Sequence, residues 1–467
     1  MSRLVVASNR IWLARTEALA GGVAVAIADV LRDRGGLWFG WSGKLNDRRE
    51  EGARTEISNR ISLAVMDMSR GEYESYYNGH ANQCLWPLCH FRLDLMAYDD
   101  TNYTAYHRVN LRMASALHRL LEEDDLIWVH DYHLIPLAAK LRSLGARQRI
   151  GFFLHIPFPP PDLLVTLPCH GELVRNLLSY DLVGLQTEGD VQRLSDYLER
   201  EGKGRIVDGI VEAFGYRSRL GCFPVGVDTG RIGELAFSAR SERDVLAMRQ
   251  SLGDRNQIIS VDRLDYTKGL LRRIGAFERL LTSRPDLHGN VELLQIAPVS
   301  RSDLQDYQDF RRELESAAAR VNGRFARVDW TPVRYLNQAV ARGRLMGYYR
   351  ASKVGLVTPM RDGMNLVCKE YVAAQDPLDP GVLVLSRFAG AAQAMSAALI
   401  VNPYDVADTA SAIGRALEMP LQERCNRHAD LMMHLRNNES SQWAERFIET
   451  LGRLENQQEP AATAFEA

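Results

Sequence analysis

The sequence predicts an α/β protein made of two doubly wound domains. Short apolar runs end at polar or turn residues, longer stretches with helical periodicity lie between them, and this alternation restarts in the second half. Such runs are typical of parallel strands that crossover helices bury on both faces. A length of 467 residues fits two or three domains, because single cores stop growing at roughly 250–300 residues.

Four strands are predicted in the first half. They span residues 4–7, 126–129, 150–154 and 182–185. Polar residues follow directly: Ser8-Asn9-Arg10 after the first run, His130-Asp131 after the second and His155 after the third. In open α/β sheets, ligands bind outside the carboxyl ends of the strands, so these side chains are candidates for binding.

Five strands are predicted in the second half, at residues 258–261, 293–297, 354–358, 382–385 and 399–401. Residues 269–281, 303–320 and 441–454 have helical periodicity. The domains are expected to span residues 1–235 and 236–455, joined near residues 228–241, with a disordered tail at 456–467. Two such domains facing each other would form a deep cleft for ligands.

Composition excludes several classes of protein. The formal net charge of -2 argues against a nucleic-acid binder. No apolar stretch approaches the roughly 20 residues of a membrane span, and no secretory signal is visible. The six cysteines form no C-x-x-C pair, which indicates reduced thiols and a cytoplasmic protein rather than a zinc or redox motif.

Three missing motifs narrow the chemistry further. There is no P-loop, so a P-loop kinase is not expected, and no G-x-G-x-x-G after the first strand, so a dinucleotide oxidoreductase is not expected. No two aspartates are spaced D-x-D. If the protein binds a diphosphate, cationic side chains and helix dipoles must therefore carry the charge, and no metal or cofactor is expected.

The segment 361–370 is the most informative part of the second half. A strand precedes it, and Asn365 can cap the helix-like run that follows. The amides of Leu366 and Val367 would then be free to bind phosphate oxygens. Glu370 could accept hydrogen bonds from a ribose and Asp362 from a sugar. A plain strand-turn-helix with a surface acid is the alternative.

Arg263 and Lys268 follow the strand at 258–261 and could together neutralise a diphosphate leaving group without a metal. In the first half, Arg10 can fork onto a phosphate, and Gly21-Gly22 permits close backbone approach to a ligand. Arg301, at a strand end in the other half, could reach the same phosphate. For each of these cations the alternative is a solvated charged loop.

The segment 130–133 contains two histidines and an aspartate, and such a group could bind a metal. No further ligand pair lies nearby, and Asp131 suits sugar hydroxyls, so sugar binding is favoured. His155 sits in an apolar, proline-rich setting and is either a functional or a core histidine. Trp41, Tyr77 and Trp86 lie near polar loops and could stack on sugar faces, although most such aromatics are core residues.

Taken together, these motifs resemble the trehalose-6-phosphate synthases of glycosyltransferase family 20, in the bacterial form without a fused phosphatase. The matching segments keep one order along the chain: residues 8–10, 21–22, 36–43, 76–78, 85–87, 130–134, 152–159, 263–269, 295–301, 362–370 and 388–391. The resemblance implies two Rossmann-like domains facing a cleft, known as the glycosyltransferase B fold.

The resemblance also implies an activity. It is the transfer of glucose from UDP-glucose to glucose 6-phosphate with retention, by a front-face displacement in which the leaving diphosphate accepts the proton. A related enzyme with a GDP or ADP donor or a glycerol 3-phosphate acceptor, and a non-catalytic sugar-phosphate sensor, are the alternatives. A homo-oligomer, dimer or tetramer, and a separate downstream phosphatase are expected.

Residue roles follow from the same resemblance. The acceptor residues are Arg10, Trp41, Tyr77, Trp86, Asp131 and Arg301. The donor residues are Gly22, Val23, His155, Arg263, Lys268, Val340, Asp362, Asn365 and the run Leu366, Val367, Cys368, Lys369 and Glu370. The residues that act in catalysis are His155, Asp131, Arg263, Lys268 and Asp362, and Trp86 and Ile156 are associated with the anomeric outcome.

The sequence departs from the family pattern in two places. The loop after Arg10 reads Ile11-Trp12-Leu13 and lacks the prolines common in the family. Position 340 is valine where a larger aromatic is often found. The first departure predicts a change in the loop near the acceptor phosphate, and the second predicts altered packing against the nucleotide base.

Overall fold

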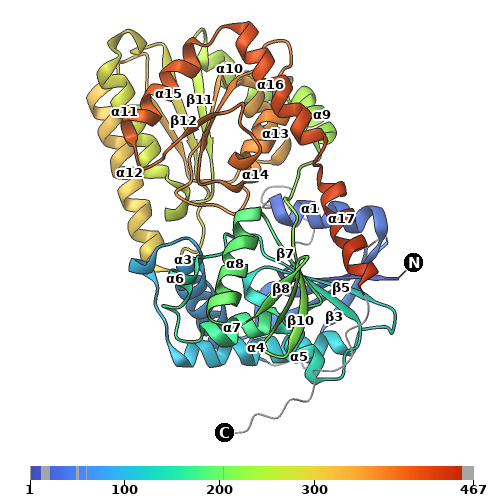
Figure 1. The fold of residues 1–467 in the computed structure, drawn as a ribbon. Coiled ribbons are helices and arrows are strands. Elements are labelled where there is room, and N and C mark those ends of the chain that lie inside the picture. Colours follow the sequence, from blue (N-terminus) through green and yellow to red (C-terminus); the bar gives the residue numbers. More distant parts are fainter. Residues whose placement is uncertain (1, 12–21, 49–51, 59, 203, 455–467) are drawn as a thin grey trace. The chain divides into compact units, whose positions relative to one another are not determined.

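The computed structural model describes residues 2–11, 22–48, 52–58, 60–202 and 204–454. Its described residues divide into two compact units (Figure 1). Of the described residues, the first contains 2–11, 23–224 and 441–454, and the second contains Gly22 and residues 225–440. Both are α/β units built on a mainly parallel sheet, as the sequence predicts.

The first unit holds a ten-stranded sheet in the order β3-β4-β2-β1-β5-β6-β7-β10-β9-β8. All pairs from β4 to β10 are parallel, and the pairs β3–β4, β10–β9 and β9–β8 are antiparallel. Its strands are β1 (Leu4–Arg10), β2 (Gly36–Leu45), β3 (Arg54–Ser58), β4 (Ile61–Met68), β5 (Leu126–His130), β6 (Arg149–Phe153), β7 (Leu182–Leu185), β8 (Arg205–Val207), β9 (Ile210–Ala213) and β10 (Tyr216–Cys222).

The helices of the first unit include one rare element. η1 (Tyr73–Leu85) is a π-helix, a form that is frequent at functional sites. The other helices are α1 (Gly22–Arg34), α2 (Arg70–Glu72), α3 (Trp86–Cys89), η2 (Leu93–Leu95), α4 (Asp100–His118), η3 (Tyr132–Leu134), α5 (Leu137–Ser143), α6 (Pro161–Leu164), α7 (His170–Leu177), α8 (Glu188–Arg200) and α17 (Ser440–Arg453).

The second unit holds a six-stranded, fully parallel sheet in the order β13-β12-β11-β14-β15-β16. This is the doubly wound 3-2-1-4-5-6 order, whose strand order reverses between β11 and β14. The strands are β11 (Asn256–Val261), β12 (Val291–Ile296), β13 (Val333–Leu336), β14 (Val354–Val357), β15 (Val382–Ser386) and β16 (Leu399–Val401).

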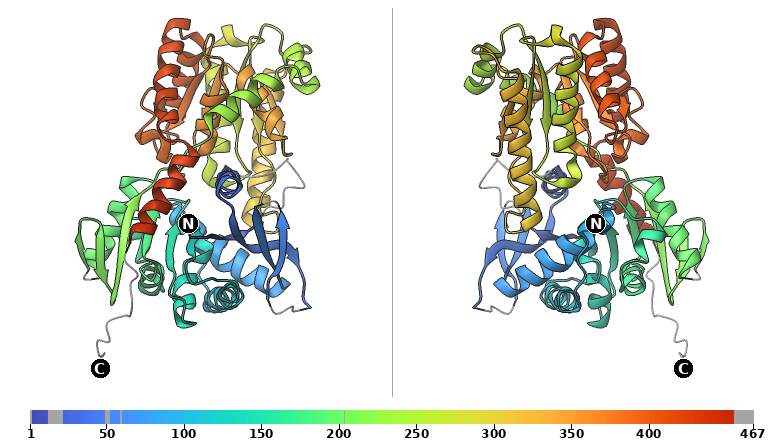
Figure 2. Two further views of the ribbon diagram at one scale, coloured as in Figure 1. Left: turned by 90° about the vertical axis from the view of Figure 1, so that its right-hand side faces the viewer. Right: turned by 90° about the vertical axis from the view of Figure 1, so that its left-hand side faces the viewer.

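Helices cover both faces of this sheet (Figures 1 and 2). Apolar residues of α11, α12 and α15 form one core with the strands, and α9, α13 and α14 pack together on the opposite side. The helices are α9 (Thr229–Ala239), α10 (Arg243–Leu252), η4 (Tyr266–Lys268), α11 (Leu270–Ser283), η5 (Pro285–Leu287), α12 (Gln305–Phe325), α13 (Arg342–Ala351), α14 (Leu366–Ala374), η6 (Gly390–Gln393), α15 (Val406–Glu418) and α16 (Leu421–Arg436).

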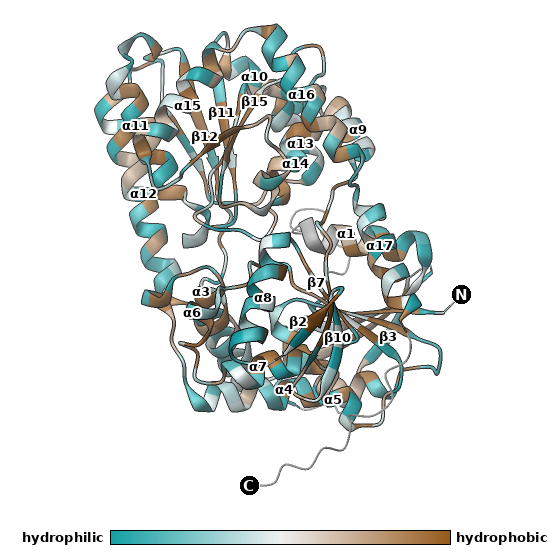
Figure 3. Ribbon diagram, viewed as in Figure 1, coloured by the Kyte–Doolittle hydropathy of each residue, from teal (hydrophilic) through white to brown (hydrophobic). Residues whose placement is uncertain are grey.

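All nine predicted strands are present, with ends displaced by no more than three residues. The central strands are hydrophobic along their length, whereas the covering helices alternate hydrophobic and hydrophilic residues (Figure 3). This contrast is the physical basis of the sequence pattern, because strands covered on both faces have no solvent side. Within the described residues, no helix combines the length and the apolar character needed to cross a lipid bilayer.

The units divide the chain differently from the predicted boundary at residue 235. Residues 229–239 form helix α9, which packs on α13 and α14 of the second unit, so the join lies nearer residue 224. α17 belongs to the first unit, where Phe447 covers Gly151 and Gly184 and Trp443 lies 4.8 Å from Trp128, between ring centroids. A Cβ atom on either glycine would lie 2.7 Å from the Phe447 ring, so the absence of a side chain at these positions leaves room for α17 to pack on the sheet.

Candidate functional site

In the first unit, the predicted acceptor residues gather at the carboxyl ends of β1 and β2. Arg10, the last residue of β1, pairs in register with Trp41 of β2, and its guanidinium lies 5.3 Å from the centroid of the Trp41 ring. Gly43 has φ +84° and would place a Cβ atom 2.6 Å from the Arg10 guanidinium. Glycine is therefore required where the Arg10 side chain crosses the strand.

The π-helix η1 brings further aromatic side chains to the same edge. Tyr77 stacks on Tyr73 at 5.3 Å and on His133 at 5.6 Å, and lies 5.8 Å from Trp41, between ring centroids. Trp86, in α3 directly after η1, lies 5.9 Å from Tyr132, which in turn packs on His133. The structure thus brings Arg10, Trp41, Tyr77 and Trp86 into one continuous row of contacts.

Asp131 and His155 follow β5 and β6, the next two strands of this sheet. Asp131 has a positive φ of 74°, which is unusual for a residue other than glycine and is often found at functional sites. Its carboxylate accepts a hydrogen bond from the backbone N–H of His155 at 3.3 Å. The two predicted residues are therefore adjacent, and Ile156 beside them is buried.

His155 has a buried partner that the sequence did not reveal. Its Nε2 lies 3.0 Å from Nδ1 of His130. Burial lowers the pKa of His155 to about 3, and burial together with His155 lowers the pKa of His130 well below its usual value. Both rings are therefore neutral near pH 7, so one donates to the other. A neutral imidazole with so low a pKa is a hydrogen-bonding group and a poor base.

In the second unit, the predicted donor residues meet where the strand order reverses. Lys268, in the loop after β11, has its Nζ 2.5 Å from Oδ2 of Asp362, which follows β14. The same carboxylate oxygen accepts a hydrogen bond at 2.9 Å from the Asn365 side-chain amide. Loops after neighbouring parallel strands on either side of this point form the usual binding crevice of such sheets.

The predicted helix N-terminus is present. Asn365 is the N-cap of α14, with φ +70°, and its side-chain oxygen accepts a hydrogen bond from the Cys368 N–H at 3.1 Å. Within the described part of the chain, no residue accepts a hydrogen bond from the amides of Leu366 or Val367. Together with the helix dipole, such amides form a suitable site for phosphate oxygens.

The side chains of residues 368–370 in α14 differ in their contacts, although the sequence suggests one shared role in donor binding. Lys369 is buried and its Nζ donates to the Val225 carbonyl oxygen at 2.6 Å, and Cys368 is buried against Met395. These two side chains stabilise the unit. Lys369 and Cys368 would therefore contact a nucleotide-sugar donor through their backbone atoms. Glu370 is largely buried, which raises the pKa of its carboxyl group, and lies 3.6 Å from Arg342.

The other predicted residues are placed as follows. Arg263 is exposed on the loop after β11. Val340 is partly buried, two residues before the Arg342 that pairs with Glu370. Gly22 is the first residue of α1 and Val23 follows it in the helix. Trp12 and Leu13, which carry the predicted loop difference, lie outside the described residues, as does the predicted tail at 456–467.

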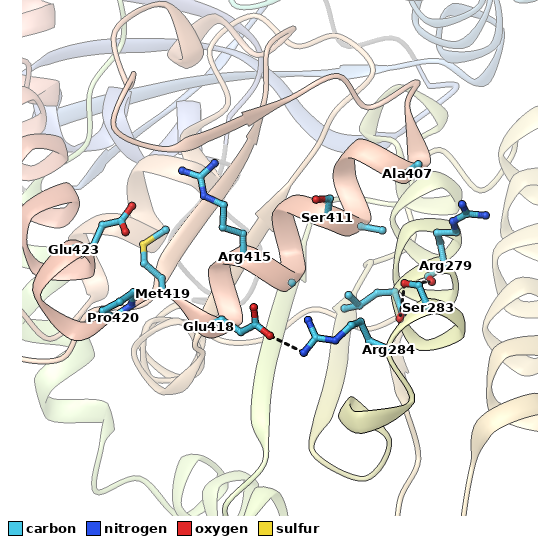
Figure 4. Close-up of a pocket in the computed structure, with 13 residues that line it drawn as sticks. Arg279, Ser283, Arg284, Ala407, Ser411, Arg415, Glu418, Met419, Pro420 and Glu423 are labelled. Atoms are coloured by element: carbon cyan, nitrogen blue, oxygen red, sulfur yellow. Dashed lines mark hydrogen bonds and ion pairs between the residues drawn. The ribbon is translucent and has the colours of Figure 1, made fainter.

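A separate hollow on the second unit contains none of these residues. It has a volume of about 550 Å³ and lies between α11 and α15. The Arg284–Glu418 ion pair, at 2.5 Å, crosses it, and the side chains of Arg279 and Arg415 point in different directions (Figure 4). The described residues contain no group of three His, Cys, Asp or Glu side chains able to hold a metal ion.

A family model, glycosyltransferase family 20, matches residues 5–453. This chain belongs to glycosyltransferase family 20. It is 48% identical over 456 residues to a trehalose-6-phosphate synthase of Sinorhizobium fredii, covering 97% of this chain and 98% of that protein. It is 47% identical over 453 residues to that of Klebsiella pneumoniae, covering 97% and 95%.

Solved structures of the family agree over the full length. A UDP-forming α,α-trehalose-phosphate synthase of Burkholderia xenovorans in complex with glucose 6-phosphate has a TM-score of 0.94 and 47% identity, covering 97% of this chain and 100% of that one. An E. coli structure bound with UDP-2-fluoro glucose has a TM-score of 0.94 and 45% identity, covering 98% and 100%. The predicted family and fold class are thus confirmed.

Proposed function

We propose that this chain transfers glucose from UDP-glucose to glucose 6-phosphate with retention, giving α,α-trehalose 6-phosphate and UDP. The observation that carries the proposal is the meeting of Lys268, Asp362 and the N-terminus of α14 where the strand order of the second sheet reverses. A cation beside free helix amides suits a sugar diphosphate. The UDP-forming synthase of Burkholderia xenovorans is in complex with glucose 6-phosphate, and the E. coli protein is bound with UDP-2-fluoro glucose.

The donor is assigned to the second unit. Arg263, Lys268 and the amides of Leu366 and Val367 hold the diphosphate, Glu370 holds the ribose and Asp362 the glucose. Lys268 is oriented by Asp362 before any ligand binds, so little reorganisation is needed when negative charge develops on the departing diphosphate. Gly22, Val23 and Val340 are assigned to donor contacts by the family resemblance.

The acceptor is assigned to Arg10, Trp41, Tyr77, Trp86, Asp131 and Arg301. Arg10 and Arg301 bind its phosphate, which is remote from the reacting hydroxyl. Binding energy from such a remote group can hold the reacting end in position. The row of aromatic rings from Trp41 to Trp86 is the apolar wall assigned to the hexose; Trp41 and Trp86 are buried in it, and Tyr77 is partly exposed.

The chemistry is a front-face displacement. The anomeric hydroxyl oxygen of the acceptor bonds to C1 of the donor glucose as the bond from C1 to the diphosphate oxygen breaks, and the hydroxyl proton passes to the leaving diphosphate. His155 hydrogen-bonds to the transferred sugar and does not take the proton, because its pKa of about 3 makes it a poor base. Orientation and charge stabilisation supply the rate enhancement.

Three further expectations belong to this proposal. The protein acts in the cytoplasm, it assembles as a homo-oligomer, and a separate phosphatase removes the phosphate ester of the product. Mass spectrometry and NMR of the product, formed from UDP-glucose and glucose 6-phosphate with a chelator present, test the activity itself. An α,α-linked disaccharide phosphate and UDP are expected. Product only with another nucleotide-glucose or with glycerol 3-phosphate, or no product at all, would contradict the proposal.

Two substitutions are expected to separate the substrates. Arg10→Ala should weaken glucose 6-phosphate binding about ten- to a hundred-fold and leave UDP binding intact, since a lost charged hydrogen bond costs about 1.5–3 kcal/mol. Glu370→Ala should do the reverse. Calorimetric titration with each ligand measures both. Arg200→Ala, which removes an exposed arginine paired with Asp162 at 3.0 Å, is the control. Loss of UDP binding in Arg10→Ala would contradict the assignment.

A further inference from the structure

One buried carboxylate contacts two parts of the second unit that the proposed function assigns to different substrates. Asp265 is fully buried and lies in the loop between β11 and α11. Its Oδ1 accepts hydrogen bonds from the N–H of Thr267 at 2.9 Å and from the Thr267 hydroxyl at 2.8 Å. Its Oδ2 accepts from Nη1 of Arg301 at 3.2 Å and from the Tyr307 hydroxyl at 3.0 Å.

The first pair of bonds shapes the loop that carries the donor cations. Asp265 is the N-cap of η4, the short helix that ends at Lys268. At the start of the same loop, Asp262 pairs at 2.7 Å with the fully buried Arg273. The loop is thus fixed at both points, and Lys268 is presented to Asp362 from a rigid backbone.

The second pair of bonds holds Arg301. Its side chain is only 5% exposed, and its backbone has a left-handed φ of 49°. Left-handed backbone at a residue other than glycine persists only where surrounding contacts enforce it. The ion pair with Asp265 and the contact with Tyr307 are such contacts.

Three cations act on this one carboxylate. Burial opposes ionisation of Asp265, yet its pKa lies below the usual value because Arg301, Arg263 and Lys268 favour the charged form and the Thr267 amide donates to it. Asp265 is therefore ionised, and its charge is balanced jointly by cations of both groups. Removing Arg301 leaves this buried charge partly uncompensated, so the carboxylate attracts the cations of the adjacent loop without a competing partner.

We propose that Asp265 is a positioning residue that couples the acceptor-phosphate arginine, Arg301, to the donor-diphosphate cations, Arg263 and Lys268. Its carboxylate holds the Arg301 guanidinium on one oxygen and the donor loop on the other. This inference rests on the proposed function, which assigns the two groups of cations to the two substrates. Asp265 touches neither substrate and acts through the side chains that it holds.

The coupling makes a counter-intuitive prediction for Arg301→Met. This variant removes an acceptor residue, yet it should weaken UDP binding about ten-fold, because the unbalanced Asp265 carboxylate then competes with the diphosphate for Arg263 and Lys268. The double variant Arg301→Met/Asp265→Asn removes that competing charge and should restore UDP affinity to within about three-fold of the unsubstituted protein. Asp265→Asn alone should weaken glucose 6-phosphate binding, since Arg301 loses its anionic partner. It should leave UDP affinity within about three-fold, since an asparagine oxygen can still accept the Thr267 hydrogen bonds that cap η4.

The measurement is calorimetric titration of UDP into the full chain and each variant, with glucose 6-phosphate titrated separately. Arg311→Met, which removes an α12 arginine paired with Glu315 at 2.7 Å, is the matched control. It should leave UDP affinity within about two-fold of the starting value. Thermal melting of every variant checks that it folds.

Recovery of UDP affinity in the double variant supports the coupling, because a residue that served stability alone would give additive losses. Unchanged UDP affinity in Arg301→Met, or a double variant weaker than either single one, overturns it. If the unsubstituted protein bound no UDP, the proposed function itself would fail, and this outcome is separate from the others.

Discussion

Replacing Lys268 with methionine is expected to lower kcat/KM about a hundred- to a thousand-fold, the usual loss when a preorganised group that stabilises developing charge is removed. The Lys268 Nζ lies 2.5 Å from Asp362, at the same edge of the sheet as the N-terminus of α14. Methionine keeps most of the side-chain volume and removes only the charge. Steady-state kinetics with both substrates varied measures the loss, which we expect mainly in kcat.

Lys353 offers a matched control. It is a half-buried lysine of the same unit, but it precedes β14, whereas Asp362 follows that strand. Lys353→Met should therefore change kcat/KM less than about three-fold, because ligands bind at the carboxyl ends of the strands and Lys353 lies at the amino end of β14. A Lys268→Met enzyme within about three-fold of the parent, or one defective only in glucose 6-phosphate binding, would remove Lys268 from the donor site.

Acidification from pH 7 to pH 5 is expected to destabilise the protein by about 4 kcal/mol through two buried histidines, His80 and His155, and His130 acts in the same direction. Burial lowers the pKa of His80 and of His155 to about 3, and that of His130 well below its usual value. Between pH 6.5 and these values the unfolded chain binds protons that the folded chain does not, so the free energy of unfolding falls as the pH falls. His80 and His155 each contribute about 2 kcal/mol at pH 5.

Urea unfolding at the two pH values measures this effect, and His80→Leu isolates one group. His80 packs among Tyr98, Tyr103 and Tyr106, beside His107. The variant should lose about 2 kcal/mol less than the parent between pH 7 and pH 5. Met113→Leu, a change in α4 with no titratable group, should lose the same as the parent. An equal pH dependence in His80→Leu would contradict the assignment. Buried carboxyl groups such as Glu370, whose pKa is raised by burial, act in the opposite direction in all three proteins.

Nine of the parallel strands were predictable because covering helices leave them no solvent-facing side, so each is a continuous apolar run. The parallel strands β2, β4, β10 and β13 and the antiparallel strands β3, β8 and β9 were not predicted. β8 alternates exposed and partly buried residues, and β3 is exposed along most of its length, so neither produces such a run. β2 was missed as a strand although its residues 36–43 belong to a family motif, since its glycines interrupt the apolar pattern. Glycine in a strand commonly marks close approach of other groups, here the Arg10 side chain.

Several candidate site residues of the second sheet were equally predictable from the sequence. The Asn365 cap and the position of Lys268 and Asp362 after their strands follow from strand ends and capping preferences, which act within a few residues of the chain. The roles of Lys369 and Cys368 could not be separated from that of Glu370 in the same way. Which side of α14 is buried depends on the Val225 carbonyl and on Met395, far away in the sequence.

The sequence by itself determined the class of fold, the family and most of the candidate residues, because these depend on periodicity and on residues near each strand end. The tertiary structure alone decided which of these residues meet. The His130–His155 pair, the Arg301–Asp265–Thr267 contacts and the return of α17 to the first sheet join segments separated by tens to hundreds of residues. Burial also set the charge states, since removal from water, and not the neighbouring sequence, keeps His130 and His155 neutral.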